Sequence, residues 1–406
     1  MKKLIAAALV AAAITPLHAA ENWVASWQAS PHAAWSEQEF VLPTGVPTVL
    51  ERQTVREMVR ISVGGRHARV VLSNRYGTQP LVIGEARIAR AEPAAAQAHG
   101  VVLTFGGQRS VTIPPGAPMV SDAIDMPVEA LEKLAVSIYL PQRTPLTTFH
   151  WGAQQTGAIA DGNLTGEAMP ANAQALHGRA LLSGIWVNTA TPASAVVAFG
   201  DSITDGNGST PDMDRRWSDY LAARLAKKGI AVVNAGISGA RLLGDRMGVN
   251  AAARFEQDVL SQPGVSTAIV LMGINDIGWP QSIFAPNEAP MTADRMIGAY
   301  RQLIVQARAR KIRIIGATMP PFEGTPIEGY YTPAKDALRQ QVNRWIKESG
   351  EFDAVADINA LLRDPANPAR MRPHYDSGDH LHPGDAGYAA MAAELAGVLS
   401  GVNRRH

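Results

Sequence analysis

The stretch that decides the fold is residues 195–208, which read AVVAFGDSITDGNG. Its first five residues are apolar, and the run ends at a glycine that is followed by a short, polar, turn-forming segment. An apolar run of this length, bounded by turn residues, is typical of a buried strand. Ser202 is therefore predicted to follow the carboxyl end of a strand, which is the end where open α/β sheets bind their ligands.

The rest of the C-terminal half alternates between the period of strands and that of helices. Apolar, β-branched segments predict strands at residues 196–199, 231–234, 267–272, 312–317 and 354–358. Helical periodicity predicts helices at residues 217–227, 293–309, 334–348 and 385–399. Because strands and helices alternate, residues 191–406 are predicted to form an α/β domain with a parallel sheet covered on both faces.

The first half has a different pattern. Short alternating or apolar runs predict strands at residues 54–63, 68–72, 81–88, 101–105, 110–113 and 134–140. Glycine and proline separate these runs, and helical periodicity is nearly absent. Residues 21–190 are therefore predicted to form an all-β domain, a sandwich or a jelly roll, whose role the sequence does not indicate. A length of 406 residues is consistent with two domains.

Residues 1–20 have the pattern of a secretory signal peptide. Lys2 and Lys3 precede an apolar run at residues 4–14, and small residues suitable for cleavage precede residue 21. A retained membrane anchor would need about 20 apolar residues, and this run is shorter and is interrupted by Pro16. The sequence thus predicts a secreted or periplasmic protein with no membrane span.

Charge and cysteine content exclude several functional classes. The chain has no cysteine, which excludes disulfides, thiolate nucleophiles and cysteine metal sites. Its 37 Lys and Arg residues balance 36 Asp and Glu residues without a long run of either sign, so no nucleic-acid partner is predicted. Composition does not indicate the oligomeric state.

Three residues can supply a nucleophilic hydrolytic site. A serine hydroxyl is a poor nucleophile at neutral pH and needs a base, together with a group that orients the base. We predict Ser202 as the nucleophile, His382 as the general base and Asp379 as the group that orients it. Asp379 and His382 are close in sequence, so a local turn can bring them together. This chemistry needs no cofactor and no metal.

Such a site also needs donors for the oxyanion that forms during acyl transfer. We predict the backbone N–H groups of Ser202 and Gly239 and the side-chain amide of Asn275. Glycine allows the backbone to approach a ligand closely. Two long loops, residues 277–291 and 320–333, are predicted to rim the crevice. Their aromatic side chains are candidates for substrate recognition: Trp279, Phe284, Tyr330 and Tyr331.

Four patches occur in a fixed order, at residues 200–206, 234–239, 273–276 and 379–382. With them the chain resembles the SGNH hydrolase family, also called GDSL esterases and lipases, over about half its length. The resemblance implies a three-layer, flavodoxin-like parallel sheet and activity on carboxylic esters, with the nucleophile at Ser202. One departure is Ile203, where the family name implies leucine.

The patterns leave alternatives open. Ser202 could merely cap a helix, as serine often does at such turns. Zinc or manganese could bind a cluster of imidazoles and carboxylates, namely His374, Asp376, Asp379, His380 and His382. The preferred interpretation is a secreted serine esterase, with short O-acyl groups such as acetyl on carbohydrate as the favoured substrates. The alternatives are a lipase, a lysophospholipase, a thioesterase, or an inactive carbohydrate-binding protein.

Overall fold

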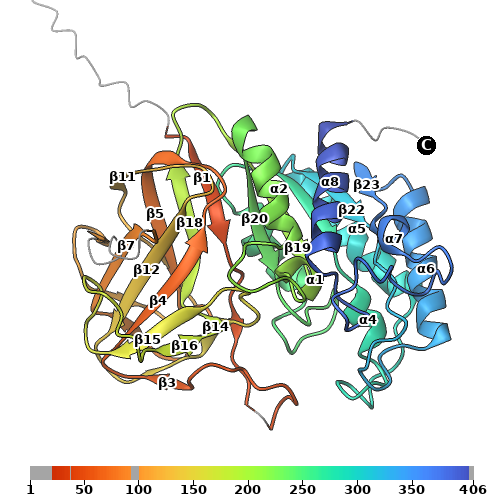
Figure 1. Ribbon diagram of the computed structural model, residues 1–406, viewed down its shortest axis with the longest axis horizontal. Helices are drawn as coiled ribbons and strands as arrows, with labels where there is room; N and C mark the ends of the chain where they lie inside the picture. Colours follow the sequence, from red (N-terminus) through yellow and green to blue (C-terminus); the bar gives the residue numbers. More distant parts are fainter. Residues whose placement is uncertain (1–20, 37, 93–99, 402–406) are drawn as a thin grey trace, which may run out of the picture.

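The computed structural model describes residues 21–36, 38–92 and 100–401, so the predicted signal peptide lies outside the described residues. An all-β part precedes an α/β part (Figure 1). We propose residue 190, between the last strand of the first part and the first strand of the second, as the boundary between two domains. Among the described residues, no helix combines the length and hydropathy that crossing a bilayer requires.

The α/β part is built on a five-stranded parallel sheet. Its strands are β19 (Ser194–Gly200), β20 (Ile230–Gly236), β21 (Val265–Leu271), β22 (Arg313–Ala317) and β23 (Ala354–Ala356). Their spatial order is β20-β19-β21-β22-β23, with every neighbouring pair parallel. This is the flavodoxin-like doubly wound order. The strand order reverses beside β19, so the ligand crevice is expected at its carboxyl end, where Ser202 follows.

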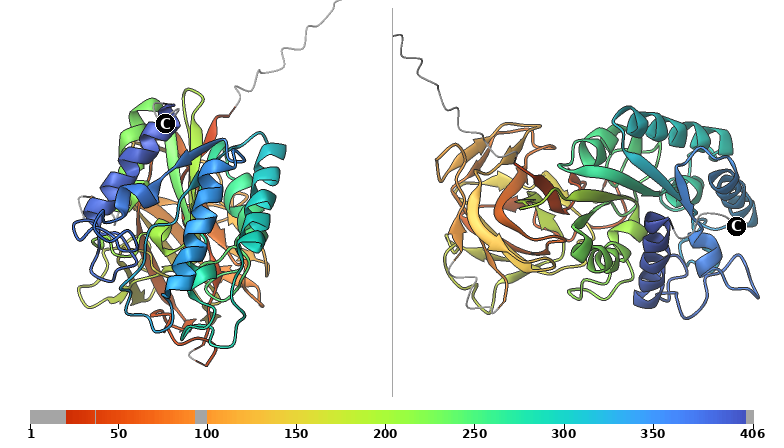
Figure 2. Two further views of the ribbon diagram at one scale, coloured as in Figure 1. Left: turned by 90° about the vertical axis from the view of Figure 1, so that its right-hand side faces the viewer. Right: turned by 90° about the horizontal axis from the view of Figure 1, so that it is seen from above.

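Helices cover both faces of this sheet, as the view from above shows (Figure 2). Val196 and Ala198 of β19 pack into a cluster with α2 (Trp217–Leu225) and α8 (Asp385–Ser400). The alternate residues Val197 and Phe199 pack into a second cluster with α5 (Ala293–Ala309) and α6 (Pro333–Glu348). Successive strand residues face opposite sides, so this apolar strand is buried on both faces. The three-layer fold class predicted from the sequence is confirmed.

The four long helices occur where the sequence predicts them, whereas several short ones were not predicted. The missed segments are α1 (Ser202–Asp205), α3 (Ala251–Phe255), η3 (Glu256–Leu260), α4 (Ile274–Gly278) and α7 (Ile358–Leu362), whereas η2 (Ala226–Lys228) continues α2 and overlaps the helix predicted at residues 217–227. Each is too short to establish a helical period. The strand predicted to reach residue 358 ends earlier because the Asp357 carboxylate accepts from the Ala360 N–H and starts α7.

The N-terminal part consists mainly of two antiparallel sheets. One contains β1 (Trp23–Gln28), β18 (Leu182–Asn188), β5 (Gly65–Ser73), β10 (Pro118–Val120) and β11 (Ile124–Val128). The other contains β16 (Gln174–Leu176), β15 (Gly157–Asp161), β4 (Gln53–Arg60), β12 (Lys133–Leu140), β7 (Glu85–Arg90) and β8 (Val101–Val102). Val70 and Ile185 of the first sheet share a buried cluster with Val55 and Ile138 of the second. The predicted all-β character is confirmed.

Shorter strand pairs complete this part. They are β3 (Val49–Leu50) with β13 (Thr144–Pro145), β6 (Leu81–Ile83) with β9 (Val111–Ile113), and β14 (Thr148–His150) with both β2 (His32–Ala33) and β17 (Arg179–Ala180). The single strand predicted at residues 81–88 is divided at Gly84 into β6 and β7. Strand β14 ends at the junction with the α/β part, where His150 contacts Asp205.

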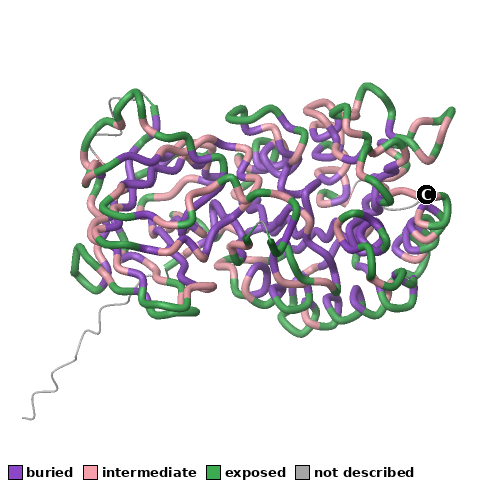
Figure 3. The backbone as a smooth tube through the Cα atoms, turned by 90° about the horizontal axis from the view of Figure 1, so that it is seen from below, coloured by how far each residue is buried: buried purple, intermediate pink, exposed green. Residues whose placement is uncertain are grey.

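The hydrophobic cores of the two parts interleave. Ala25 and Phe40, from the N-terminal part, belong to the cluster beneath α5 and α6, and Ala195 and Ala231 belong to the cluster of the β part. Strand β1 lies beside β20, the edge strand of the parallel sheet. The Val232 N–H on that edge donates to Ser62 Oγ at 2.8 Å. Buried residues therefore continue from one part into the other (Figure 3).

Candidate active site

Ser202 is the first residue of α1 and is separated from the end of β19 by Asp201. The Asp201 carboxylate caps this helix by accepting from the Ile203 N–H at 3.0 Å, and Gly206 ends it with a φ of +110°. Burial raises the pKa of Asp201 to about 7, although the Ile203 N–H opposes the shift. The cap is thus provided by Asp201, which leaves the Ser202 hydroxyl, in a residue 6% exposed, free of that role.

The structure brings Ser202, His382 and Asp379 together. His382 Nε2 lies 2.7 Å from Ser202 Oγ, and His382 Nδ1 lies 2.6 Å from Asp379 Oδ2. Because a carboxylate accepts, Nδ1 carries the proton and Nε2 can accept the serine proton. The turn between the two is local, since Asp379 Oδ1 accepts from the N–H groups of Leu381 at 2.9 Å and His382 at 2.8 Å. This geometry suits a general base beside a nucleophile.

Asp379 stays ionised in this arrangement. Burial alone would raise the pKa of its carboxyl, but the hydrogen bond and charge of His382, with the backbone N–H groups of His382 and Leu381, lower that pKa well below its ordinary value. A permanently ionised carboxylate orients the imidazole and stabilises the imidazolium that forms when the base takes a proton.

The predicted oxyanion donors lie in backbone and side-chain positions that the surroundings fix. Gly239 has a φ of +77°, and a Cβ there would lie 2.4 Å from Met247 Sδ, so only glycine fits. Asn275 is buried in α4 and its Nδ2 donates one N–H to the Ala240 carbonyl at 3.0 Å. The second N–H of this amide is the candidate oxyanion donor.

Two predicted rim residues lie elsewhere. Trp279 and Tyr330 are each 1% exposed, so they do not rim the crevice. The polar atoms of both side chains have hydrogen-bond partners in this buried position. Trp279 Nε1 donates to Asn275 Oδ1 at 3.1 Å, and the Tyr330 hydroxyl donates to the same oxygen at 2.7 Å. Buried indole and phenol groups need such acceptors. Both residues therefore fix the orientation of the Asn275 amide, a role that the sequence analysis missed.

The other two rim candidates are half-buried. Phe284 packs against Trp279, with ring centroids 5.2 Å apart, and Tyr331 packs edge-on against Phe322 at 5.1 Å. Their role in substrate recognition stays a prediction.

A buried carboxylate ties α4 to the loop that follows Gly239. Asp276 is fully buried, and its carboxylate accepts from the N–H groups of Leu242 at 2.7 Å and Leu243 at 3.1 Å. Burial raises the pKa of Asp276 to about 6, against the effect of these two donors. The pair of bonds keeps Asn275 and Gly239, from different elements, in a fixed relation.

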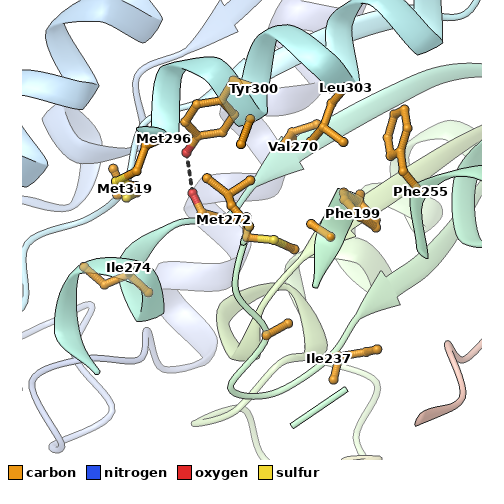
Figure 4. Packing of buried hydrophobic residues seen from close by; sticks show 14 of the residues in the cluster. Phe199, Ile237, Phe255, Val270, Met272, Ile274, Met296, Tyr300, Leu303 and Met319 are labelled. Atoms are coloured by element: carbon orange, nitrogen blue, oxygen red, sulfur yellow. Dashed lines mark hydrogen bonds between the residues drawn. The ribbon is translucent and has the colours of Figure 1, made fainter. Parts of the chain in front are cut away.

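Helix α5 fixes the end of the strand that precedes Asn275. The Tyr300 hydroxyl donates to the Met272 carbonyl at 2.6 Å (Figure 4). The next residue, Gly273, has a φ of +117°, and a Cβ there would lie 2.8 Å from Met296 Cε and 2.9 Å from the Tyr300 oxygen. Glycine is required here for both space and conformation.

The histidine cluster of the last loop separates into two pairs. His380 Nδ1 lies 2.6 Å from Asp376 Oδ2, apart from the pair that His382 forms with Asp379. Within residues 21–36, 38–92 and 100–401, no group of three or more His, Asp or Glu side chains is placed to hold a metal ion.

Residues 198–390 match the family model described as the GDSL-like Lipase/Acylhydrolase family. Similar solved structures include a GDSL-like lipase from Bacteroides thetaiotaomicron (20% identity, 52% of this chain and 89% of that chain, TM-score 0.40). They also include a lipolytic protein of the G-D-S-L family from Veillonella parvula (19%, 51% and 99%, TM-score 0.39) and an acetylxylan esterase mutant from Geobacillus stearothermophilus (24%, 52% and 95%, TM-score 0.40). No curated protein matches the chain. The part of the chain that holds Ser202 and His382 belongs to the GDSL-like lipase/acylhydrolase family.

Proposed function

We propose that the protein is a secreted serine esterase that hydrolyses carboxylic esters through an acyl-enzyme. The observation that carries this proposal is the continuous hydrogen-bonded chain from Ser202 Oγ through His382 to Asp379. Secretion is supported by the signal-like pattern of residues 1–20.

The proposed reaction follows from that chain. Ser202 Oγ attacks the ester carbonyl carbon while His382 Nε2 accepts the hydroxyl proton. The tetrahedral oxyanion accepts from the Ser202 and Gly239 N–H groups and from Asn275 Nδ2. Its collapse breaks the ester C–O bond, and His382 returns the proton to the departing alcohol. Water, deprotonated by the same imidazole, then attacks the acyl-enzyme and releases the carboxylic acid.

A sugar alcohol is the substrate moiety that we favour, with a short acyl group such as acetyl. A cavity of about 340 Å³ adjoins the segment that carries Ser202, since Asn207 and Gly208 line it. The half-buried Trp151 lines it together with polar side chains, among them Gln154 and His177. An aromatic face with several hydrogen-bonding groups suits a polyol.

A larger cavity of about 410 Å³ lies between the β part and η3. It is lined by residues such as Val71, Trp186 and Asp258, and none of its lining residues belongs to α1 or to the turn that follows α1. We therefore do not assign it to the ester substrate.

The test is covalent labelling together with a substrate series. The wild-type protein should react with a fluorophosphonate probe and hydrolyse p-nitrophenyl acetate, and Ser202→Ala should abolish both. If Ser202→Ala kept most of the activity, the assignment would be wrong. A carbohydrate-binding protein without activity would bind glycans and remain unlabelled.

Chain length and alcohol separate the finer alternatives. A short-chain glycan esterase should prefer acetyl over octanoyl and palmitoyl esters and should release acetate from acetylated oligosaccharides. Faster turnover of long-chain or thioester substrates would favour a lipase or a thioesterase instead.

A further inference from the structure

A histidine of the β part reaches the loop beside the nucleophile. His150, at the end of β14, is 4% exposed, and its Nε2 lies 2.9 Å from Oδ1 of Asp205, the last residue of α1. Asp205 is 1% exposed. The other ring nitrogen, Nδ1, lies 2.8 Å from the Ser30 carbonyl oxygen. A residue of the N-terminal part thus pairs with the segment that carries Ser202.

The second carboxylate oxygen of Asp205 continues the connection. Asp205 Oδ2 accepts from the Ser238 N–H at 3.0 Å and from the Ser238 hydroxyl at 2.7 Å. Ser238 immediately precedes Gly239, whose N–H is a proposed oxyanion donor. A direct path of hydrogen bonds therefore runs from His150 through Asp205 to the peptide next to that donor.

Both ring nitrogens of His150 take part in hydrogen bonds. Both ring nitrogens of His150 face oxygen atoms, and the Ser30 carbonyl can only accept, so Nδ1 carries a proton. The contact between Nε2 and Asp205 Oδ1 needs a further proton, on the nitrogen or on the oxygen. Because both groups are buried, this hydrogen bond is a fixed link between the β part and α1.

The backbone after His150 is fitted against the same loop. Gly152 has a φ of +76°, and a Cβ there would lie 2.9 Å from Ser238 Oγ and 3.1 Å from Asp205 Oδ2. A second buried histidine holds this segment, because the Trp151 N–H donates to His32 Nε2 at 2.9 Å. Burial lowers the pKa of His32 to about 3, so its Nε2 remains an acceptor.

We propose that His150 is a positioning residue for ester hydrolysis. It holds Asp205, Asp205 holds the Ser238 N–H, and this aims the Gly239 N–H at the oxyanion. The β part thereby completes the active site of the α/β part. This inference rests on the proposed esterase function, and His150 itself does not touch the substrate.

The central experiment compares His150→Ala with His150→Gln in the full-length protein. Losing one oxyanion donor reduces turnover by on the order of 10² to 10³, so His150→Ala should lower kcat by about 10- to 10³-fold. KM should change little, because the oxyanion bond strengthens in the transition state. His150→Gln should recover much of kcat, since its amide can donate to Asp205.

Two further variants separate positioning from stability. Ile138→Ala truncates the buried core of the β sandwich, so it should lower Tm without changing kcat per active site, as titrated with the fluorophosphonate probe. Asp205→Asn can keep all the bonds, accepting from Ser238 and donating to a neutral His150, so it should retain far more kcat than Asp205→Ala. The comparison of Asp205→Asn with Asp205→Ala provides the test if His150→Ala does not fold.

The outcomes are distinguishable. The proposal is overturned if folded His150→Ala keeps kcat per active site within about twofold of the wild type, or if Asp205→Asn and Asp205→Ala have equal kcat. A wild-type protein without esterase activity, or an active Ser202→Ala variant, would instead refute the proposed function.

Discussion

Asn275 shows how single contacts determine what a catalytic amide can do. An amide side chain can present either its oxygen or its nitrogen to a ligand. Here Oδ1 is held by Trp279 Nε1 and by the Tyr330 hydroxyl, so the nitrogen must face the other way. The two aromatic residues therefore determine that the amide nitrogen, and not the oxygen, faces the crevice.

Tyr330→Phe should weaken this orientation while keeping the packing. We expect kcat to fall about threefold to tenfold, because one hydrogen bond contributes about 0.5–1.5 kcal/mol. Steady-state kinetics would measure the change, with Tyr139→Phe, at a half-buried tyrosine of β12 in the all-β part, as the control. Equal kcat in both variants and the wild type would show that Tyr330 does not orient Asn275.

Asp201 should make stability depend on pH. Its folded pKa of about 7 exceeds the ordinary value of about 3.9, so between these pH values the folded state binds more protons than the unfolded state. Its contribution to the free energy of unfolding must therefore decrease as pH rises from about 4 to 7. In thermal scans, the Tm of Asp201→Asn should decrease less between pH 5 and pH 8 than the Tm of the wild type. An identical pH dependence in the two proteins would contradict this expectation.

At the scale of elements, one lysine joins three segments around the site. Lys335, in the first turn of α6, donates from Nζ to the carbonyls of Gly278, Pro280 and Gly329 at 2.6–2.8 Å. These carbonyls belong to the end of α4 and to both long loops that follow strands β21 and β22. The ammonium thus holds α4, which carries Asn275, against the start of α6.

Lys335→Met should loosen this arrangement by leaving three carbonyls without their donor. We expect a loss of about 1–3 kcal/mol in the free energy of unfolding, measured by urea denaturation. Lys347→Met is the control in the same helix, since Lys347 forms only a partly exposed ion pair with Asp357 at 3.3 Å. Exposed pairs contribute about 0–1 kcal/mol, so a larger loss in the control than in Lys335→Met would refute the role.

Periodicity within the elements determines which features of the structure could be predicted from the sequence. Strong strand and helix periods predicted the parallel sheet and its long helices, and Ser202, Asp379 and His382 were found because they follow a strand or precede a helix. The burial of Trp279 and Tyr330 could not be foreseen, because a loop sequence does not reveal which aromatic residues fold inward. His150 was missed for another reason: it lies in the other half of the chain, and no local pattern connects it with Asp205.

The whole molecule should unfold as one cooperative unit. Side chains of each part belong to the hydrophobic cluster of the other, as Phe40 and Ala195 illustrate. Neither core can be exposed without opening its neighbour, so calorimetry should record a single transition whose calorimetric and van't Hoff enthalpies agree. Two separate transitions, one of which leaves the fluorophosphonate reaction intact, would contradict this expectation.

The contact of β1 and Ser62 with strand β20 has a consequence for protein engineering. An uncovered edge strand offers unpaired N–H and C=O groups to any other chain and promotes aggregation. Here the all-β part covers the edge of β20 and protects it from pairing with other chains. Removing the all-β part, or replacing it with an unrelated fusion domain, would expose the edge of β20 and promote aggregation. Chimeras of this protein should therefore keep the two parts together.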